Sequence, residues 1–591
     1  MNNNWGRLAL LAATLIAAFF LLRTCSGCQG GTSTQPFTLN VRMEAPATVL
    51  NPYMPATGYS NFVAMRIFQS LGDFDPITLD LKPLLVKRIP EARTVTEGPH
   101  QGQLAYDFEV NELATWDNGS PVTARDVEFS LKLIFHPGLP TLRWRGFFEY
   151  VESIEFDPAN PRKFTVFLKQ YYMLGLESLC QFPIYPAYHY DAQGHLANIP
   201  LTDFLNPAKA AELSKNPTAM AFADEFQQPK YKNDPAWVVG SGPYRLETMS
   251  GEQGLTLLKK QNWWGDKASE QYPLLAAYPA RINYQVVLEE PAIENMLRNE
   301  QLDLAVDMSP VNFRRLEKDP DLSAKYDFLT NWTTRYNRWV FNMTNPKLKD
   351  QRVRQALAYL VNYNDLVQNI QLGLAQRMIG PINPRKGYYN KSLKPYDYNV
   401  EEAKRLLAEA GWTDSNNDGT VDKEIDGKRV ELTLDMLTTP ASKVAEMVGN
   451  SIAQSASVGG VKINIVPLSI KELGDLTRGG KFETAIFASA QHSGWADMFQ
   501  NYHSGSLASL GGDNRNFFAD STFDQAVVKI RTTPDTSARY APYMEAQRIL
   551  HEMLPEVVLY TSDYRYIVAK KYRYLLTPNR PGYQEQMFQQ R

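Results

Sequence analysis

Cysteine and histidine are scarce in this chain, which has 3 Cys and 7 His among its 591 residues. Cys25 and Cys28 lie close to the N-terminus, so Cys180 has no cysteine partner in the rest of the sequence and that part forms no internal disulfide. We expect Cys180 to be buried and unreactive. The histidines are scattered, and none forms the HxxxH spacing of a zinc site. We therefore predict no metal and no cofactor, with a zinc site assembled from distant residues as the alternative.

An excess of positive charge is also absent. Lys and Arg number 61 against 64 Asp and Glu, which gives a formal net charge of -3. Because proteins that bind nucleic acid present broad basic surfaces, we expect no nucleic acid partner. Hydrophobic residues make up 44% and charged residues 21%, the balance of an ordinary globular protein, and the length predicts two or three domains.

Catalytic motifs are missing as well. Gly240-Ser241-Gly242 is not the G-x-S-x-G turn that exposes a nucleophilic serine, and Gly479-Gly480-Lys481 lacks the first glycine and the Ser/Thr of a P-loop. We predict that the protein is not an enzyme. A hydrolase whose catalytic residues meet only in the folded chain is the alternative.

Long apolar runs are limited to one, Leu8 to Leu22, which lies between Arg7 and Arg23. Its fifteen residues would span about 22 Å as a helix, less than the ~30 Å of a hydrocarbon core. This favours the apolar region of a signal peptide over a transmembrane helix, so we expect an exported and otherwise soluble protein.

The segment Cys25-Ser26-Gly27-Cys28 resembles a bacterial lipobox, in which small residues precede the cysteine that carries the lipid. Cys25 stands where Leu is usual, and an uncleaved anchor is the alternative. A redox Cys-x-x-Cys pair is disfavoured because no βαβ pattern surrounds it. We predict a signal peptide and lipobox over 1–28, lipidation at Cys28, and a flexible spacer over 29–36.

From Phe37 onward, short strands alternate with helices, a mixture that predicts α/β lobes. Helices are expected after three capping residues, Thr123, Asp350 and Asn399, and another starts at Asn364 or Asp365. The polar, proline-containing stretch from Leu205 to Asp234 is predicted to be an irregular segment between elements. Period-two alternation predicts strands at Tyr106, Phe108 and Val110, at Phe164, Val166 and Leu168, and at Val430, Leu432, Leu434 and Met436, the last after an Asp426-Gly427 turn.

Taken together, a set of segments in order along the chain resembles the family 5 extracellular solute-binding proteins, the peptide- and nickel-binding receptors of ABC importers. The segments are Trp116 to Val127, Val239 to Leu246, Leu255 to Gly265, Asp350 to Leu357, Tyr398 to Trp412 and Ala519 to Asp524. The resemblance implies an α/β, two-lobed periplasmic-binding-protein fold of the large type, with an extra subdomain on lobe one.

This fold implies that the chain crosses twice between the lobes, near Tyr326 to Thr334 and near Pro555 to Thr561. Lobe one is expected at 37–330, with its subdomain at about 82–195. Lobe two is expected at 331–556, and 557–591 return to lobe one.

The resemblance gives a ligand role to Ser493-Gly494-Trp495-Ala496-Asp497. In peptide-binding members a similar Gly-Trp…Asp segment lies in the cleft, where the carboxylate meets the peptide's α-ammonium. A shielded carboxylate forms a strong charge-assisted bond, and an adjacent ring covers side chains. The segment is one residue shorter here, so Trp495 and Asp497 cannot both occupy the family positions without a shift. A strand-end turn with a solvated Asp497 is the alternative.

Trp332, Tyr336 and Trp339, close to the expected hinge, are further ligand-binding candidates. Amphipathic strand packing explains them equally well. The segment Asp414 to Gly419 with Asp422 imitates a calcium loop, but Ile425 stands at the position of the bidentate Glu, which favours a plain turn.

The implied function is that of a monomeric receptor on the periplasmic or extracytoplasmic face of a membrane, tethered by lipid. It closes two lobes over a small solute, short peptides being expected, and delivers it to an ABC permease with its ATPase. The alternatives are a hinged receptor for a nickel chelate, haem or an oligosaccharide, a signalling or surface-capture receptor, and lastly a periplasmic hydrolase.

Overall fold

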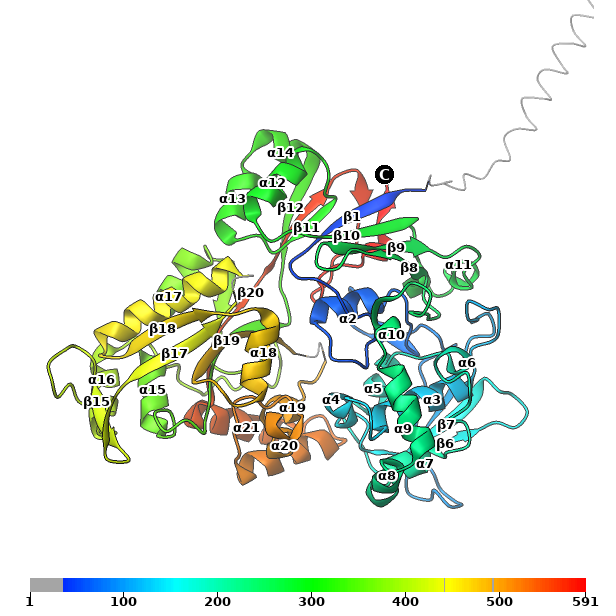
Figure 1. Cartoon of the computed structure of the whole chain (residues 1–591), viewed down its shortest axis with the longest axis horizontal. Helices are drawn as coiled ribbons and strands as arrows, with labels where there is room; N and C mark the ends of the chain where they lie inside the picture. Colours follow the sequence, from blue (N-terminus) through cyan, green and yellow to red (C-terminus); the bar gives the residue numbers. More distant parts are fainter. Residues whose placement is uncertain (1–35, 440–441, 492–493) are drawn as a thin grey trace, which may run out of the picture.

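The computed structural model describes residues 36–439, 442–491 and 494–591. The expected signal peptide, Cys25 and Cys28 lie outside the described residues, as do 440–441 and 492–493. The described chain forms two α/β lobes, each with its own mixed sheet, and a smaller unit beside the first lobe (Figure 1). The two-lobed α/β fold predicted from the sequence is confirmed.

The lobe-one sheet combines strands from both ends of the chain. Its order is β12 (Tyr326–Asn331), β21 (Tyr564–Ala569), β11 (Leu304–Val306), β1 (Thr38–Met43), β10 (Arg281–Val286), β9 (Gly254–Lys259) and β8 (Tyr244–Met249). β1 is parallel to β10 and β11, whereas β21 lies antiparallel between β11 and β12. Its helices are α2 (Gly58–Ala64), α11 (Gly265–Ala268), α12 (Glu290–Arg298), α13 (Pro310–Glu317) and α14 (Pro320–Lys325).

The smaller unit holds a sheet in the order β4 (Ala92–Thr94), β5 (Leu104–Glu109), β7 (Lys163–Leu168) and β6 (Val151–Phe156). Helix α3 (Ala124–Phe135) begins after Thr123, as predicted, and Thr123 and Asp126 form a capping box. The other helices of this unit are α4 (Leu142–Arg145), α5 (Gly175–Gln181), α6 (Ala187–Tyr190), α7 (Leu201–Leu205), α8 (Pro207–Leu213), α9 (Pro217–Phe226) and α10 (Lys230–Asn233). Cys180 is buried in α5, as predicted, and burial raises the pKa of its thiol.

The lobe-two sheet has the order β14 (Ala375–Arg377), β20 (Glu556–Ser562), β13 (Arg335–Phe341), β19 (Thr484–Ala490), β17 (Thr433–Thr438) and β18 (Lys462–Pro467). Its helices are α15 (Gln351–Tyr359), α16 (Val400–Glu409), α17 (Lys443–Val458), α18 (Ile470–Arg478), α19 (Phe499–Tyr502), α20 (Ser521–Thr532) and α21 (Tyr540–Met553), with a π-helical turn at Asp365–Ile370. Asp350 and Asn399 cap α15 and α16 as predicted.

The polypeptide passes between the sheets at two places. β12 of the lobe-one sheet leads through Trp332, Thr333 and Thr334 into β13 of the lobe-two sheet. On the return, Asp563 separates β20 from β21, and β20 pairs along the lobe-two sheet up to Ser562. We therefore place the two hinge segments at 332–334 and at 563.

Two expectations about local structure were wrong. Leu205 to Asp234 is helical over much of its length, because Asn206 and Asn216 each accept hydrogen bonds from the first turn and a proline follows each at the first helical position. The alternation from Val430 to Met436 is divided between β16 (Lys428–Glu431), which pairs with β15 (Asp422–Ile425), and β17. The Asp426-Gly427 turn between β15 and β16 is confirmed, with both residues at positive φ.

Candidate functional site

A pocket with a volume of about 300 Å³ lies between the lobes. Phe147 and Leu174 come from the smaller unit of lobe one, and the other lining residues come from lobe two, so closing the lobes completes the pocket. Its volume matches the lower range of small-molecule sites. The lining residues are Phe147, Leu174, Tyr336, Pro381, Ala490, Gln491, Ala496, Asp497, Met498, Gln500, Asn501 and Tyr502.

Strand β19 brings an open backbone edge to this pocket. It pairs with β13 over its full length but with β17 only at Thr484 and Ala485. Since Gln491 N donates to Thr334 O at 3.0 Å, the alternation of the antiparallel ladder turns the backbone groups of Ala488 and Ala490 away from β13. Within the described ranges, no backbone group pairs with these two residues on that side. Their N–H and C=O groups are therefore available to a ligand.

Asp497 lies in the pocket wall, and its side chain is only 4% exposed. Its Oδ1 accepts a hydrogen bond from Phe499 N at 2.9 Å, and its Oδ2 accepts one from Tyr172 Oη at 2.9 Å. Arg531 Nε lies 3.1 Å from the same Oδ2, in ion-pair contact. The carboxylate is thus neither solvated nor free, in contrast to the strand-end alternative of a solvated Asp.

Arg531, on α20, is the cation that pairs with Asp497. Its Nη1 donates to Glu149 Oε1 at 2.5 Å, and its Nη2 donates to Gly146 O, both across the lobe interface. The rings of Phe499 and Tyr172 lie 4.4 and 4.6 Å from the guanidinium carbon. Burial opposes the charge, but the carboxylates of Asp497 and Glu149 outweigh it and raise the pKa of Arg531.

A buried polar network supports the pocket wall behind Tyr336. The Tyr336 and Tyr502 hydroxyl oxygens lie 3.3 Å apart, and Tyr502 donates to Glu556 Oε1 at 2.6 Å. Arg338 donates to the other carboxylate oxygen of Glu556 at 2.6 Å. Because each hydroxyl is held by the next group, the two tyrosine rings keep fixed positions in the wall.

Of the predicted ligand residues, the structure brings Asp497 and Tyr336 into the pocket wall. Trp332 and Trp495 are not among the described residues that line it. Trp495 stacks on Tyr388 at 4.7 Å, inside lobe two. Trp332 is half-buried in the first hinge segment, with the Arg385 guanidinium 5.4 Å from its ring. Trp339 is fully buried against Phe341, as the packing alternative describes.

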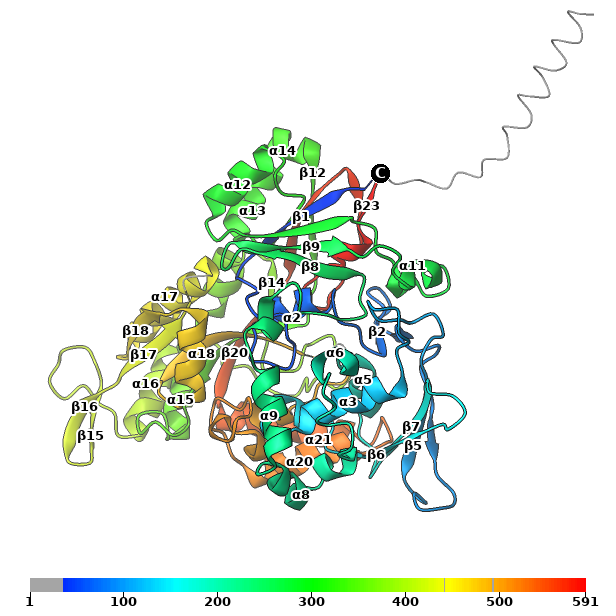
Figure 2. The same ribbon diagram turned by 45° about the vertical axis from the view of Figure 1, so that its right-hand side comes forward.

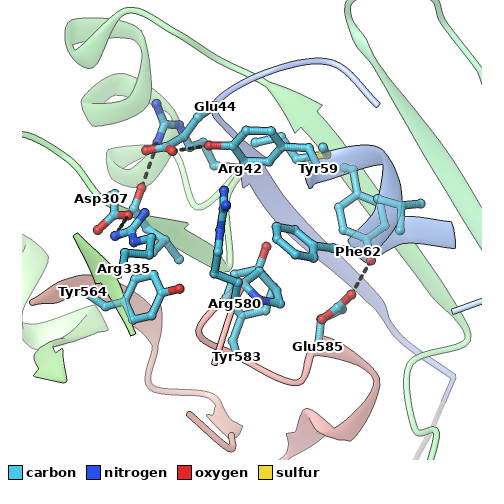
Figure 3. Close-up of a pocket in the computed structure, with 15 residues that line it drawn as sticks. Arg42, Glu44, Tyr59, Phe62, Asp307, Arg335, Tyr564, Arg580, Tyr583 and Glu585 are labelled. Atoms are coloured by element: carbon cyan, nitrogen blue, oxygen red, sulfur yellow. Dashed lines mark hydrogen bonds and ion pairs between the residues drawn. The ribbon is translucent and has the colours of Figure 1, made fainter. Parts of the chain in front are cut away.

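A second pocket lies at the hinge (Figure 3). Its volume is about 40 Å³, and a water molecule needs roughly 10–15 Å³, so it holds a few waters and no solute of peptide size. Arg580 extends into it between Tyr564 and Phe62 (Figure 3). Tyr59 donates to Glu44 Oε2 at 2.5 Å, and Arg42 bonds the other oxygen at 3.0 Å.

A charge cluster centred on Asp307 joins the lobes at this hinge. Asp307, at the end of β11, forms an ion pair with Arg335 at the start of β13 and lies 3.6 Å from Arg565 Nη2 on β21. Burial disfavours its ionised form, but the two guanidinium charges outweigh burial and hold the pKa of Asp307 below its ordinary value. Lobe-one and lobe-two backbone are thereby linked next to both hinge segments.

Among the residues of the site that the sequence did not reveal are Arg531, Tyr172 and Gln500. Arg531 reads as one of several basic residues on an amphipathic helix, and Tyr172 follows a strand in a different part of the chain. Gln500 lines the pocket, and its Nε2 atom is buried with no hydrogen-bond partner among the described residues. No local sequence signal distinguishes any of them.

The turn from Asp414 to Asp422 is held by its own hydrogen bonds. In the turn from Asp414 to Asp422, Asp414 accepts from Asp418 N and Gly419 N, and Asp422 accepts from Ser415 and Arg429, so the carboxylates serve a plain turn. Across the described ranges, no group of three or more His, Cys, Asp or Glu side chains is arranged to hold a metal ion. None of the described helices combines enough length with enough apolar character to span a bilayer.

Two α/β lobes joined by two strand crossings, with a pocket between them, define the class of hinged binding proteins. The sequence model of the bacterial extracellular solute-binding proteins, family 5, matches residues 90–509. The chain belongs to this family. The resemblance stated from the sequence is thereby confirmed, and the family is one of receptors.

The relatives and the solved structures agree with this family. The chain is 24% identical over 320 residues to "Di/tripeptide-binding protein 2" of Pseudomonas aeruginosa (strain UCBPP-PA14), covering 54% of this chain and about half, 55%, of that protein. It is 22% identical over 576 residues to "Oligopeptide-binding protein AppA" of Bacillus subtilis (strain 168), covering 94% and 93%.

The solved structure of Bacillus subtilis AppA in complex with a nonapeptide superposes with a TM-score of 0.77, at 19% identity, over 94% of this chain and 99% of that one. NikZ of Campylobacter jejuni with Ni(L-His) superposes with a TM-score of 0.73, at 20% identity, over 94% and 99%. These likenesses establish the fold.

Proposed function

We propose that this protein is the solute-binding component of an ABC importer and that its solutes are short peptides. The observation that carries the proposal is the open edge of β19 at Ala488 and Ala490, beside the pocket between the lobes. A peptide adds to such an edge as an extra strand, so main-chain hydrogen bonds provide affinity that does not depend on its side chains. Similarity to a protein named for oligopeptide binding, over 94% of the chain, supports the same solute class.

The pocket walls supply the remaining contacts. Phe147, Leu174 and Met498 offer apolar surface, and Gln491, Gln500 and Asn501 offer uncharged hydrogen-bonding groups. Tyr336 and Asp497 contact the solute from the lobe-two wall. We assign Trp332 and Trp495 supporting positions, at the hinge segment and behind Asp497.

Capture proceeds by rotation about the two hinge segments. In the open form the solute binds lobe two, and Phe147 and Leu174 of lobe one then close the pocket over it. The solute stabilises the closed form because only that form gives it contacts with both lobes. Micromolar affinity corresponds to about 8 kcal/mol, enough to capture a solute and still allow release to a permease.

The partners follow from this role. A membrane permease and a cytoplasmic ATPase receive the closed monomer and supply the energy of transport. We propose export by the signal peptide and tethering of the mature protein through a lipid on Cys28, on the periplasmic or extracytoplasmic side. A Cys28→Ala variant tests the tether: release of the protein from the membrane fraction supports lipidation, and unchanged retention indicates an uncleaved anchor.

A nickel chelate is the second candidate solute, favoured by the likeness to NikZ, whose structure holds Ni(L-His). Haem and oligosaccharides, a signalling or surface-capture role, and hydrolysis are weaker alternatives. No observation on the pocket favours any of these.

Native mass spectrometry of the body from Gln29 onward tests the proposal. Small masses that co-purify, dissociate under denaturing conditions and fragment as peptides would support it and give the length range. A single non-peptide mass would overturn the peptide assignment. If the protein emerges without ligand, addition of mixed peptides and of Ni(II) with histidine decides between the two candidates.

A further inference from the structure

The family resemblance implies that Asp497 meets a positive charge of the solute, but the chain itself already provides a positive charge there, Arg531. Arg531 is 1% exposed, and its guanidinium lies between the carboxylates of Asp497 and Glu149 and against the rings of Tyr172 and Phe499. A guanidinium held in this way by charges, a carbonyl oxygen and aromatic faces is fixed in place. It is not a mobile surface cation that a solute displaces.

The pair of Asp497 and Arg531 also persists when the lobes separate. Both residues belong to lobe two, whereas Glu149, Gly146 and Tyr172 belong to lobe one. Opening therefore removes the lobe-one partners of Arg531 and leaves its ion pair with Asp497. A solute that enters the open form meets a carboxylate whose charge is already compensated.

The rest of the pocket wall carries no charge. Asp497 is the single acidic or basic residue among the described residues that line the pocket, and the other polar lining groups are amides and tyrosine hydroxyls. A solute in the pocket therefore meets no charged group other than the ion pair of Asp497 and Arg531.

From this geometry we infer that Arg531 replaces the solute's positive charge at Asp497, so that the pocket accepts the uncharged end of a solute: an amide, an acylated amine or a lactam. For the proposed function, on which this inference rests, the preferred solutes are short peptides whose N-terminal amine is blocked. A free α-ammonium at this wall would stand beside the Arg531 guanidinium without a carboxylate of its own.

The test offers the intact body of the protein two matched probes, a random tripeptide mixture with free amines and the same mixture after N-acetylation. Retention of each is measured by native mass spectrometry and by competition. We expect the acetylated mixture to be retained with at least tenfold higher affinity. Equal retention, or preference for free amines, overturns the role of Arg531 while peptide binding stands. Retention of neither mixture overturns the peptide function itself and this inference with it.

Two further measurements separate a charge effect from a shape effect. The α-amine of a peptide has a pKa of about 8, so raising the pH from 7 to 9 should strengthen binding of free-amine peptides and leave acetylated ones unchanged. An Arg531→Met variant should shift the preference toward free amines, because Asp497 then lacks a partner. Arg548→Met, on the exposed side of α21, is the matched control and should keep the wild-type preference. If Arg531→Met does not fold, the pH series on the wild-type protein still decides.

Discussion

Arg531 and Glu149 form a 2.5 Å hydrogen bond across the two lobes. Around it, Met173 N donates to Arg531 O at 2.8 Å, and Tyr172 donates to Asp497. In Figures 1 and 2, helices α20 and α21 lie against the smaller unit of lobe one at this place. The side chains of Tyr172, Met173 and Leu174 belong to one apolar cluster with residues of both helices. These contacts between the lobes therefore stabilise the closed form in addition to the contacts that a solute makes with both lobes.

Replacing Glu149 by Gln should weaken the contact between the lobes at Arg531. The side chain of Glu149 is 41% exposed, so we expect its loss to cost only about 1 kcal/mol of closed-state stability. Solute affinity should fall roughly fivefold, and a fluorescence-transfer pair with one dye on each lobe should report more of the open form. Glu152→Gln is the matched control, since Glu152 pairs with Lys169 inside the same unit. An equal effect of both variants would contradict the role of Glu149 in stabilising the closed form.

Replacing Ala490 by Pro should weaken peptide binding through the backbone alone. Proline removes the N–H that faces the open edge and leaves the ladder between β19 and β13 intact, which edge positions tolerate. Loss of one hydrogen bond predicts a three- to tenfold weaker affinity, about 1 kcal/mol, in titration calorimetry with an unchanged melting temperature. Ser489→Pro is the control, because that N–H belongs to the ladder and its loss should lower the melting temperature. Unchanged affinity in Ala490→Pro would exclude strand addition.

Asp307→Asn should destabilise the hinge strongly, because Arg335 and Arg565 would share no buried counter-charge. We expect a loss of about 3–5 kcal/mol in the free energy of unfolding by denaturant titration, against a change within about 0.5 kcal/mol for the exposed Asp321→Asn. Since the folded pKa of Asp307 is lowered, its contribution is complete above about pH 4 and is lost as the pH falls toward that lowered pKa. In the Asp307→Asn variant, this part of the loss of stability at low pH should be absent. A loss no larger than in the control would contradict the assignment.

His136 should make the smaller unit less stable in mild acid. Burial lowers the pKa of this imidazole from 6.5 to about 4. In this pH range the His136 imidazole binds a proton in the unfolded chain but not in the folded chain. The free energy of unfolding therefore falls as the pH drops from about 6.5 toward 4, by up to about 3 kcal/mol. The difference in unfolding free energy between wild type and His136→Leu should change across this range. A difference that does not depend on pH would show that His136 has no such role.

The sequence predicted those parts of the fold that depend on neighbouring residues. Thr123 with Asp126, Asp350 and Asn399 cap helices through atoms only a few positions away, so their signals are complete in a short window. The helices after Asn206 and Asn216 carry equally local signals, because an Asn-Pro pair is as typical of a helix start as of a loop. Correct use of the Asn-Pro pairs would have predicted both.

The site was predicted less completely, for a physical reason. The resemblance pointed to Asp497, and Tyr336 lies in the same wall. The partner that changes the chemistry of Asp497 is Arg531, whose position depends on Glu149, 382 residues away in sequence, and on Gly146, 385 residues away. Contacts of such separation are set by how the lobes meet, and nothing in one sequence marks them.

The central place of β21 in the lobe-one sheet has a consequence for biosynthesis. Residues Tyr564–Ala569 lie between β11 and β12, so these two strands have no common neighbour until almost the whole chain has been made. Lobe two, whose strands end at Ser562, is complete just before. The first lobe can therefore complete its sheet only after almost the whole chain has been made. A chain truncated before Tyr564 should consequently lack a stable first lobe, because β11 and β12 then have no strand between them.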